Sequence, residues 1–501
     1  MAATEEIMFS QTKSLPYEAR TVGVVAKSDT LCSTGYNLMT FGKQVYLFDC
    51  DGRVVHEWSS DRNCFCCYLL KNGNLLRDGS DANFAPDFRT GGSAGYVEEV
   101  TWDGEVVWSF DHYPYNDKLT HHDLEPLPNG NVLIMSWEKK TKKECEDAGR
   151  RPELIPEGEV WDTVILELKP NGEGGADVVW RWSLWDHCVQ DYDSSKPNYV
   201  EKIKDHPELY DLNFCLAGGI AGARDESLLF SGVSPDKLTH AGAKSVRGGK
   251  DWLHSNSVAY DYVRDQVIIS LNAVSEIIIV DHSTTIAESQ GHSGGKSGRG
   301  GDILYRWGNP QAYQAGTRME QKLFNQHSVH FLRDVPGDGR ILLFNNGKLP
   351  QRKWSTIDEI ELPETEPNSG VYVAHEKKKT FGPTSPAWSY GPKANHQNSF
   401  FCTHISGVQR LPNGNSLITM GPQGLLIEVT PTGEEVWRYV SPVCKVGSDS
   451  AASSVVSFVR QGDHRPSEGR FSLFRVLRYS PDFPAFQGRE LEKLAGRFLE
   501  A

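Results

Sequence analysis

The sequence predicts an all-β protein, a six-bladed β-propeller with loop insertions and a short C-terminal tail. Three observations support this prediction. A chain of 501 residues contains 47 Gly, 13 Trp, 18 Tyr and 21 Phe, which favours short strands and tight turns over helices. One strand pattern with aromatic residues recurs six times, and turn signals separate its strands. Closing such sheets into a ring leaves few strand edges exposed.

The recurring strand has two β-forming residues followed by an aromatic residue, any residue, and a second aromatic residue. An upstream run, often containing an acidic residue as in LLIEVTPTG, is followed by a turn signal and then by this strand. Alternation, a short turn and renewed alternation are typical of a β-hairpin. The six copies, one of them degenerate, are VVHEW (54–58), VVWSF (106–110), VVWRW (178–182), ILYRW (303–307), SPAWSY (385–390) and EVWRY (435–439).

A further apolar strand follows a tight turn in most units, which gives four strands per unit. Examples are LKNGNLLR (70–77), LPNGNVLIMS (127–136), VPGDGRILLFN (335–345) and LPNGNSLITM (411–420). We therefore assign 35–470 to one propeller, 1–34 to an N-terminal segment and 471–501 to a tail that packs on the propeller. Within the tail, FRVLRYS (474–480) is expected to form a strand and RELEKLAGRFLE (489–500) a short amphipathic helix.

Composition excludes several classes of partner. The net charge of −14 disfavours nucleic acid, because phosphate binding requires clustered Lys and Arg. No apolar segment approaches the roughly 20 residues that span a bilayer. The first residues lack the apolar region of a secretory signal, so a cytoplasmic location is expected. Ten cysteines, including CFCC (64–67), are expected to be reduced, half-buried thiols, because no second pair follows at zinc-site spacing.

Three long insertions interrupt the repeats: 138–159, 183–250 and 286–302. The last of these contains GGKS, which resembles part of a phosphate-binding loop. The loop pattern requires a glycine where Gln290 stands, and the segment lies between two strands instead of opening a helix. A nucleotide site is therefore not expected there.

Four histidines precede predicted innermost strands, which line the channel of a propeller: His122, His254, His327 and His404. Each is delivered by a different blade to a similar height, so we expect a shared pocket at one mouth of the channel. On a regular strand, neighbours and residues three apart point to opposite faces. His327 and His330 are therefore not expected to face the channel together, nor are His121 and His122.

Imidazoles at a channel mouth allow two kinds of chemistry. A neutral imidazole can attack a sulfuryl group, hold it covalently and pass it on, while other donors stabilise the equatorial oxygens. Three or four histidines around one point also suit zinc, copper or iron. Each histidine taken alone is equally well explained as a hydrogen-bonded structural residue.

The elements HHDLEPLPNGNVLI, DWLHSNSVAYDYVRDQVIIS, NQHSVHF, HISGVQRLPNGNSLIT and FRVLRYSPDFP resemble the arylsulfotransferase family of the PAPS-independent aryl-sulfate sulfotransferase type. The similarity extends from about residue 35 to 487, and the chain looks like a divergent member. This resemblance implies a six-bladed propeller that moves a sulfuryl group from a phenolic sulfate to a phenol through a sulfated histidine. It implies no PAPS and no other cofactor; a metal enters only in an alternative hypothesis.

Matched by motif, the resemblance implies that His327 is the nucleophile and that His122 and His254 contact sulfuryl oxygens. Asn256, Asn272 and His404 are the implied substrate-binding residues. Asn272 occupies a position where the family pattern has arginine, and loss of such a charge-assisted donor weakens an anion site by about 1–3 kcal/mol. Arg306 and Lys244 are candidates to replace it.

Three hypotheses follow. The first is a transferase that uses a phenolic sulfate donor and a phenol acceptor through His327. The second is a metal-dependent enzyme that uses His122, His254, His327 and His404. The third is a non-catalytic binding platform, which a channel plugged by the 183–250 insertion would favour, since propellers host many unrelated functions.

Overall fold

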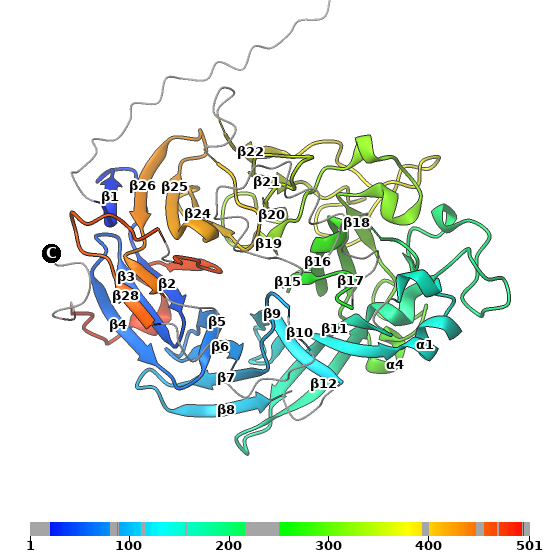
Figure 1. Ribbon diagram of the computed structural model, residues 1–501, viewed down its shortest axis with the longest axis horizontal. Coiled ribbons are helices and arrows are strands. Elements are labelled where there is room, and N and C mark those ends of the chain that lie inside the picture. The colour runs from blue at the N-terminus through cyan, green and yellow to red at the C-terminus, as the bar shows by residue number, and fades with distance from the viewer. Residues whose placement is uncertain are drawn as a thin grey trace, which may run out of the picture.

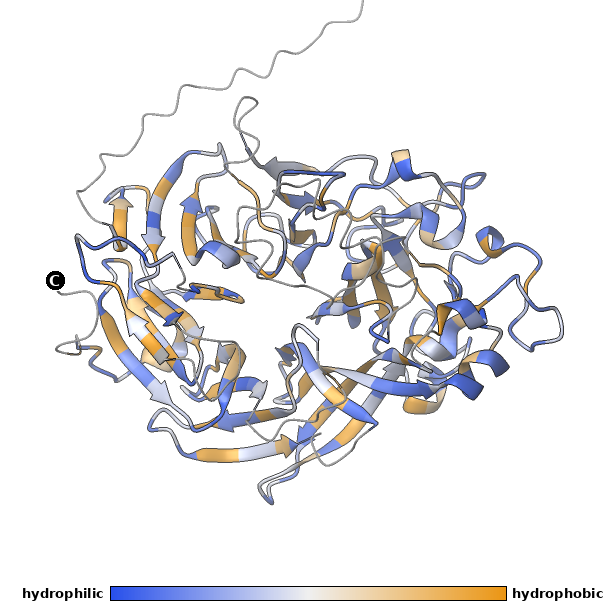
Figure 2. Cartoon of the chain, viewed as in Figure 1, coloured by the Kyte–Doolittle hydropathy of each residue, from blue (hydrophilic) through white to orange (hydrophobic). Residues whose placement is uncertain are grey.

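The computed structural model describes residues 21–80, 88, 90–111, 117–155, 158–215, 250–392, 400–446, 455–467, 470–492 and 494. Within these residues, six antiparallel sheets surround one axis, and the predicted six-bladed β-propeller is confirmed (Figure 1). Hydrophobic and hydrophilic residues are interspersed along the strands of the blades (Figure 2). Each blade buries apolar side chains against its neighbours, as sheet packing requires.

Each blade runs from an innermost strand at the channel to an outermost strand. The first is β29 (Val476–Tyr479), β2 (Tyr36–Phe41), β3 (Gln44–Asp49) and β4 (Val54–Ser59). The second is β5 (Asn63–Leu69), β6 (Leu75–Ser80), β7 (Tyr96–Val100) and β8 (Val106–Asp111). The third is β9 (Lys118–Pro126), β10 (Val132–Thr141), β11 (Glu159–Pro170) and β12 (Ala176–Ser183).

The remaining blades follow the same order. The fourth is β15 (Ser255–Asp261), β16 (Gln266–Leu271), β17 (Glu276–Asp281) and β18 (Tyr305–Trp307). The fifth is β19 (His327–Phe331), β20 (Ile341–Asn345), β21 (Thr356–Ile360) and β22 (Trp388–Tyr390). The sixth is β23 (Gly407–Arg410), β24 (Ser416–Met420), β25 (Leu425–Val429), β26 (Glu435–Val440) and β1 (Gly23–Lys27).

All six aromatic repeats coincide with the fourth strands β4, β8, β12, β18, β22 and β26. Several of their tryptophans join one blade to the next. The indole Nε1 of Trp58 donates to Thr101 O at 3.2 Å, and that of Trp437 donates to Cys50 O at 2.9 Å. Buried indole N–H groups require such partners, so the repeat marks inter-blade contacts as well as strands.

The Asn-Gly-Asn turns are stabilised in a way that explains the acidic residue of each upstream run. The last asparagine of each turn donates from its side chain to a glutamate on the third strand of the same blade. These pairs are Asn74 with Glu99 (2.6 Å), Asn131 with Glu167 (2.5 Å) and Asn415 with Glu428 (2.6 Å). Turn and strand are thereby fixed in one register.

Both ends of the described chain enter the ring. β29, from the tail, pairs with β2 from Tyr36↔Tyr479 to Met39↔Val476 and forms the innermost strand of the first blade. β1 pairs with β26. The strand predicted at 474–480 is thus found. Of the helix expected at 489–500, residues 489–492 and 494 are described and are not helical, and the rest lie outside the described residues. The boundaries at 34 and 470 stay a prediction.

Smaller elements occupy the insertions and connections. They are helices α1 (Lys142–Asp147) and α4 (Ile286–Ser289); 3₁₀ helices η1 (Pro152–Leu154), η2 (Leu184–His187), η3 (Ile203–Asp205), η4 (Asn272–Val274), η5 (Pro310–Tyr313), η6 (Arg318–Glu320), η8 (Gly421–Gln423) and η9 (Pro484–Phe486); and strands β13 (Cys188–Val189), β14 (Tyr210–Asp211), β27 (Val443–Val446) and β28 (Val455–Phe458). No helix in the described part of the chain is long and apolar enough to cross a membrane.

The thiols are more enclosed than expected. All ten cysteines lie in the described residues and are free. Cys64, Cys66 and Cys67, expected to be half-buried, are buried on β5, with exposed fractions of 2 to 7%. Because β5 is an innermost strand between neighbouring blades, both of its faces are covered.

Candidate active site

Hydrogen bonds join successive innermost strands into a closed circle around the axis. Val258 N–H faces Asp123 Oδ2 at 3.4 Å, and Val329 N–H donates to Ser257 Oγ at 3.0 Å. From β23 the circle returns through the tail to β5, where Tyr479 Oη accepts from Leu69 N–H at 2.9 Å. The toroid that the pocket hypothesis requires is therefore present.

Four innermost strands are irregular, and three of them, β9, β15 and β19, carry or directly follow one of the histidines. Pairing with the second strand shifts in β5, β9, β15 and β19. Left-handed backbone angles occur at or beside the histidines, at His122 (φ 58°), His254 (45°), Ser328 (54°) and Ile405 (42°). A non-glycine residue in a sparsely populated conformation costs on the order of 1–3 kcal/mol, and such residues cluster at functional sites.

The bulges overturn the expectation about which histidines share a face. His327 pairs with Phe344 and His330 pairs with Leu342, so a step of three residues along β19 matches a step of two residues along β20. The inserted residue restores the same side for both histidines. The adjacent His121 and His122 also come together, with their Nδ1 atoms 2.9 Å apart. The prediction from strand alternation fails here because alternation holds only for a strand without bulges.

His122 and His254 meet across two blades. Their rings are 4.5 Å apart in an edge-to-face arrangement, and both are buried. His254 Nδ1 lies 2.5 Å from Asp251 Oδ2, which orients the ring. The ring of His122 lies against Gly92, where an added Cβ would stand 2.0 Å from Nε2.

His327 is held in one tautomer. Its Nδ1 lies 2.8 Å from Asn346 Oδ1 and 3.1 Å from Asn325 O, and both of these atoms only accept hydrogen bonds. Nδ1 therefore carries the proton. Nε2 then has the lone pair, and it accepts from Ile405 N–H at 3.1 Å. A histidine oriented in this way presents the nitrogen that a nucleophile needs.

Asn256 and Asn272 are built into the wall behind His327. Both donate from Nδ2 to Gln326 O, at 2.9 and 3.0 Å, and Asn325 Nδ2 donates to Asn272 Oδ1 at 3.0 Å. Asn272 is 1% exposed. The structure thus shows both asparagines positioning the segment that carries His327.

His404, on the sixth blade, comes next to the segment that contacts His327. Its Nδ1 lies 2.8 Å from Thr403 Oγ1, and it is 9% exposed. The neighbouring Ile405 makes the contact with His327 Nε2. The rings of His122 and His254 are in contact. His327 contacts the backbone N–H of Ile405, the residue that follows His404.

Sequence reasoning missed one functional candidate: Arg475 of the tail reaches the channel wall. Its guanidinium donates to Asp123 Oδ1 at 2.7 Å and to Tyr68 Oη at 2.7 Å, and it lies 2.9 Å from Cys66 Sγ. The sequence signal that could have identified this residue is an arginine directly before the strand of the tail, β29. Asp123 follows His122, so the charge lies one residue away from the paired imidazoles.

Arg306, one of the two expected replacements for the family arginine, is in the wrong place. It lies on the outermost strand β18, where its guanidinium forms a buried pair with Glu276 at 2.7 Å. Lys244 lies outside the described residues. Arg475 is an arginine that the fold brings to the channel wall, beside Asp123.

Burial controls protonation around Arg475. Desolvation, reinforced by the nearby Asp123, raises the pKa of Glu125 to about 8. Burial lowers the pKa of His330 to about 4, and it also lowers that of His121. Since desolvation disfavours the charged form of each group, it favours neutral imidazoles at His330 and His121 and a protonated carboxyl at Glu125 near neutral pH.

A propeller whose channel mouth presents oriented imidazoles is a scaffold for nucleophilic or electrostatic catalysis on a small anionic group. The Arylsulfotransferase (ASST) family model matches residues 29–441. The chain belongs to this arylsulfotransferase family, and that membership supports an aryl sulfotransferase activity in general terms.

Other comparisons are weaker. No curated protein matches the chain. Solved structures that share similarity include a protein of unknown function from Bacteroides caccae, at 12% identity and TM-score 0.39, covering 81% of this chain and 94% of that one. A streptogramin B lyase gives 8% identity and TM-score 0.35 over 88% and 87% of the chains. The periplasmic gluconolactonase of Pseudomonas aeruginosa gives 11% and 0.36 over 85% and 99%.

Proposed function

We propose that the protein transfers a sulfuryl group from an aryl sulfate to a phenolic acceptor through a sulfated His327. The observation that carries the proposal is the fixed tautomer of this residue, with its proton on Nδ1 and its lone pair on Nε2. Membership of the arylsulfotransferase family supports the same assignment. No PAPS is required, because the histidine itself carries the group between donor and acceptor.

In the first half-reaction, Nε2 of His327 attacks the sulfur of the aryl sulfate. The N–S bond forms, the bond between sulfur and the aryl oxygen breaks, and the phenolate leaves. Asn346 and Asn325 stabilise the positive charge that develops on the ring, because both accept from Nδ1–H. The N–H of Ile405 must release the lone pair, and it is then placed to donate to a sulfuryl oxygen.

The paired imidazoles of His122 and His254 supply further donors to the sulfuryl oxygens. Asp251 Oδ2 lies 2.5 Å from Nδ1 of His254 and fixes the orientation of this ring. Positioning and electrostatic stabilisation account for most catalysis of this kind of transfer. In the second half-reaction the acceptor oxygen attacks sulfur, the N–S bond breaks, and over the cycle the acceptor's proton passes to the released phenol.

Turnover of a chromogenic aryl sulfate with a phenol acceptor tests the proposal. His327→Gln is expected to reduce kcat by roughly 10³-fold or more, since removal of a nucleophile has effects of this size or larger. His330→Gln is the matched control, because it alters a half-buried histidine of the same strand. Absence of turnover by the wild type, or an unchanged kcat in His327→Gln, would refute the assignment.

A further inference from the structure

A second group of histidines lies far from the channel mouth, at the junction of two insertions. His187 ends η2 in the 183–250 insertion, while His292 and Asp302 belong to the glycine-rich segment after α4. The nitrogen and oxygen atoms that these three residues offer lie within 4.8 Å of one another. Among the described residues, this is the one set of three potential ligands that converges in this way, and the channel histidines form no such set.

Hydrogen bonding fixes the chemistry of His187. Its Nε2 lies 2.8 Å from Ser289 O, which can only accept, so Nε2 carries a proton. Its Nδ1 lies 2.9 Å from Asp302 Oδ1. In the neutral imidazole this would place a lone pair against a carboxylate oxygen, so the contact requires a cation, either a second proton on the ring or a metal ion.

His292 distinguishes between these two cations. Its Nδ1 also points at Asp302 Oδ1, at 2.7 Å. Two imidazole nitrogens thus share one carboxylate oxygen of Asp302, whereas an ion pair would need only one imidazole. Histidine whose second nitrogen donates to a backbone carbonyl is also the usual arrangement of a metal ligand.

The surroundings hold His187 rigidly. Its ring stacks on Trp182 with centroids 5.9 Å apart and planes within 4°. Trp182 in turn donates from Nε1 to Gly301 O at 2.8 Å. A Cβ at Gly301 would lie 2.5 Å from His187 Nε2, so glycine is needed beside the ring. A preformed ligand of this kind reduces the cost of ordering on binding.

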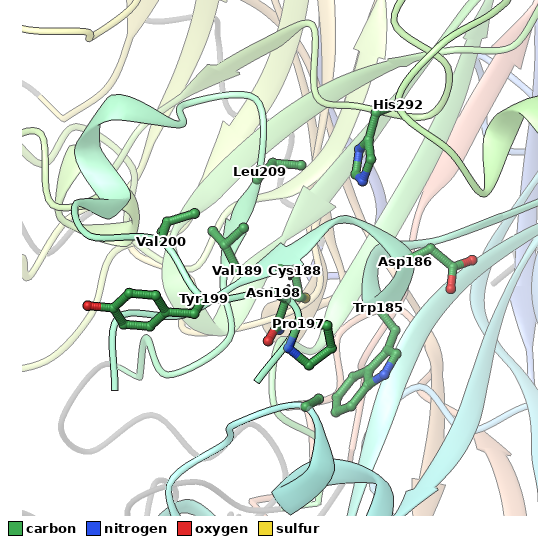
Figure 3. Close-up of a pocket in the computed structure, with 11 residues that line it drawn as sticks. Trp185, Asp186, Cys188, Val189, Pro197, Asn198, Tyr199, Val200, Leu209 and His292 are labelled. Carbon is green, nitrogen blue, oxygen red and sulfur yellow. Dashed lines mark hydrogen bonds between the residues drawn. The ribbon is translucent and has the colours of Figure 1, made fainter. Parts of the chain in front are cut away.

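His292 keeps the cluster open on one side. Its side chain is 61% exposed, whereas those of His187 and Asp302 are 0% and 8% exposed. It lines a pocket of about 430 Å³ together with Trp185, Cys188 and Tyr199. Figure 3 shows His292 at the edge of this pocket with its ring directed toward the other lining side chains.

We propose that His187 Nδ1, His292 Nδ1 and Asp302 Oδ1 bind one divalent ion of the zinc class, with a fourth position open to the pocket. Two imidazoles disfavour Ca²⁺ and Mg²⁺, which prefer oxygen ligands. Tetrahedral zinc with bonds of roughly 2.0–2.2 Å separates its ligands by roughly 3.3–3.5 Å. The present contacts of 2.7 and 2.9 Å must therefore widen slightly. The exposed His292 can move away from Asp302, and the carboxylate of Asp302 must turn away from the rigidly held His187.

Cys188, although it lines the same pocket, is not one of the ligands. Its Sγ donates to Leu184 O at 3.3 Å, and burial raises the pKa of the thiol well above its usual value. A bound ion would instead tie the 183–250 insertion to the segment between α4 and β18. It would thereby stabilise the outer side of the fourth blade without entering the sulfuryl-transfer chemistry.

Titration of metal-free full-length protein with Co²⁺ tests this proposal. Visible d–d bands of a tetrahedral site are expected to saturate at one equivalent, and Zn²⁺ is expected to displace Co²⁺. His292→Ala and Asp302→Asn are each expected to weaken binding by at least about 100-fold, since even the loss of an outer partner costs roughly 10–100-fold. Circular dichroism of His292→Ala checks that the fold is retained.

Two controls locate the ion. His206→Ala removes a partly exposed histidine of the same insertion, and His327→Gln removes the channel nucleophile; neither is expected to change the Co²⁺ spectrum. Absence of d–d bands at one equivalent would overturn the proposal in favour of a protonated ion pair. Bands that persist in both His292→Ala and Asp302→Asn would also overturn it. These readouts do not depend on turnover, so they separate this proposal from the sulfotransferase assignment.

Discussion

Replacing Arg475 by methionine removes the cation from the channel wall while retaining the bulk of the side chain. Arg475 makes bonds of 2.7 Å to Asp123 and to Tyr68, and Asp123 is 2% exposed. Breaking a buried ion pair on one side costs about 3–5 kcal/mol, because the remaining charge has no partner. With an unfolding entropy of about 2.1 cal/mol/K per residue, 501 residues convert this loss into a Tm lower by about 3–5 °C.

Differential scanning of three variants tests this reasoning. Arg438→Met breaks a partly exposed pair with Glu435 and is expected to lower Tm by about 1 °C or less. The double variant Arg475→Met/Asp123→Asn removes the stranded charge, so it should regain at least half of the Tm lost by Arg475→Met. If Arg475→Met behaves like Arg438→Met, or if the double variant regains nothing, the buried pair does not stabilise the ring as described.

Further predictions concern the mouth and one ion triad. Gly92→Ala places a Cβ 2.0 Å from His122 Nε2, so kcat should fall at least about tenfold, whereas Gly104→Ala, equally left-handed but open, should leave kcat unchanged. Asn272→Ala frees the segment before His327 and should lower kcat with little effect on KM. Burial lowers the pKa of His282, but its bonds to Asp265 and Glu167 prevail and raise it to about 9. Protonated His282 stabilises the fold by up to about 3 kcal/mol. This stabilisation is complete below pH 6.5 and is lost as pH rises through about 9, so the difference in Tm between the wild type and His282→Gln should shrink over that range. A difference in Tm that stays the same over that range would contradict the stabilising role of protonated His282.

The blades were predictable because the repeats follow local sequence rules. The aromatic strands and Asn-Gly-Asn turns follow from alternation and turn chemistry within a few residues. The tail strand was also recognisable, but its partner was not: the pairing Tyr36↔Tyr479 joins opposite ends of the sequence. Nothing local in either strand specifies that pairing.

The sequence nominated candidate site residues but did not indicate their geometry. Motif positions pointed to His122, His254 and His327, and the structure brings the first two into ring contact. The bulges that set their directions are backbone irregularities within apolar strands, which alternation cannot reveal. The roles of Asn272 and Arg475 depend on contacts between blades, so the sequence could not show which arginine reaches the channel.

The central claim is that His327 Nε2 carries the sulfuryl group, and trapping that adduct tests it most directly. Protein incubated with an aryl sulfate in the absence of acceptor would be digested and analysed by mass spectrometry under mildly alkaline conditions. The expected result is the mass of one SO₃ group on the peptide containing His327, discharged on addition of a phenol. A protein that turns over substrate but carries the group on another residue, or never carries it, would contradict the account.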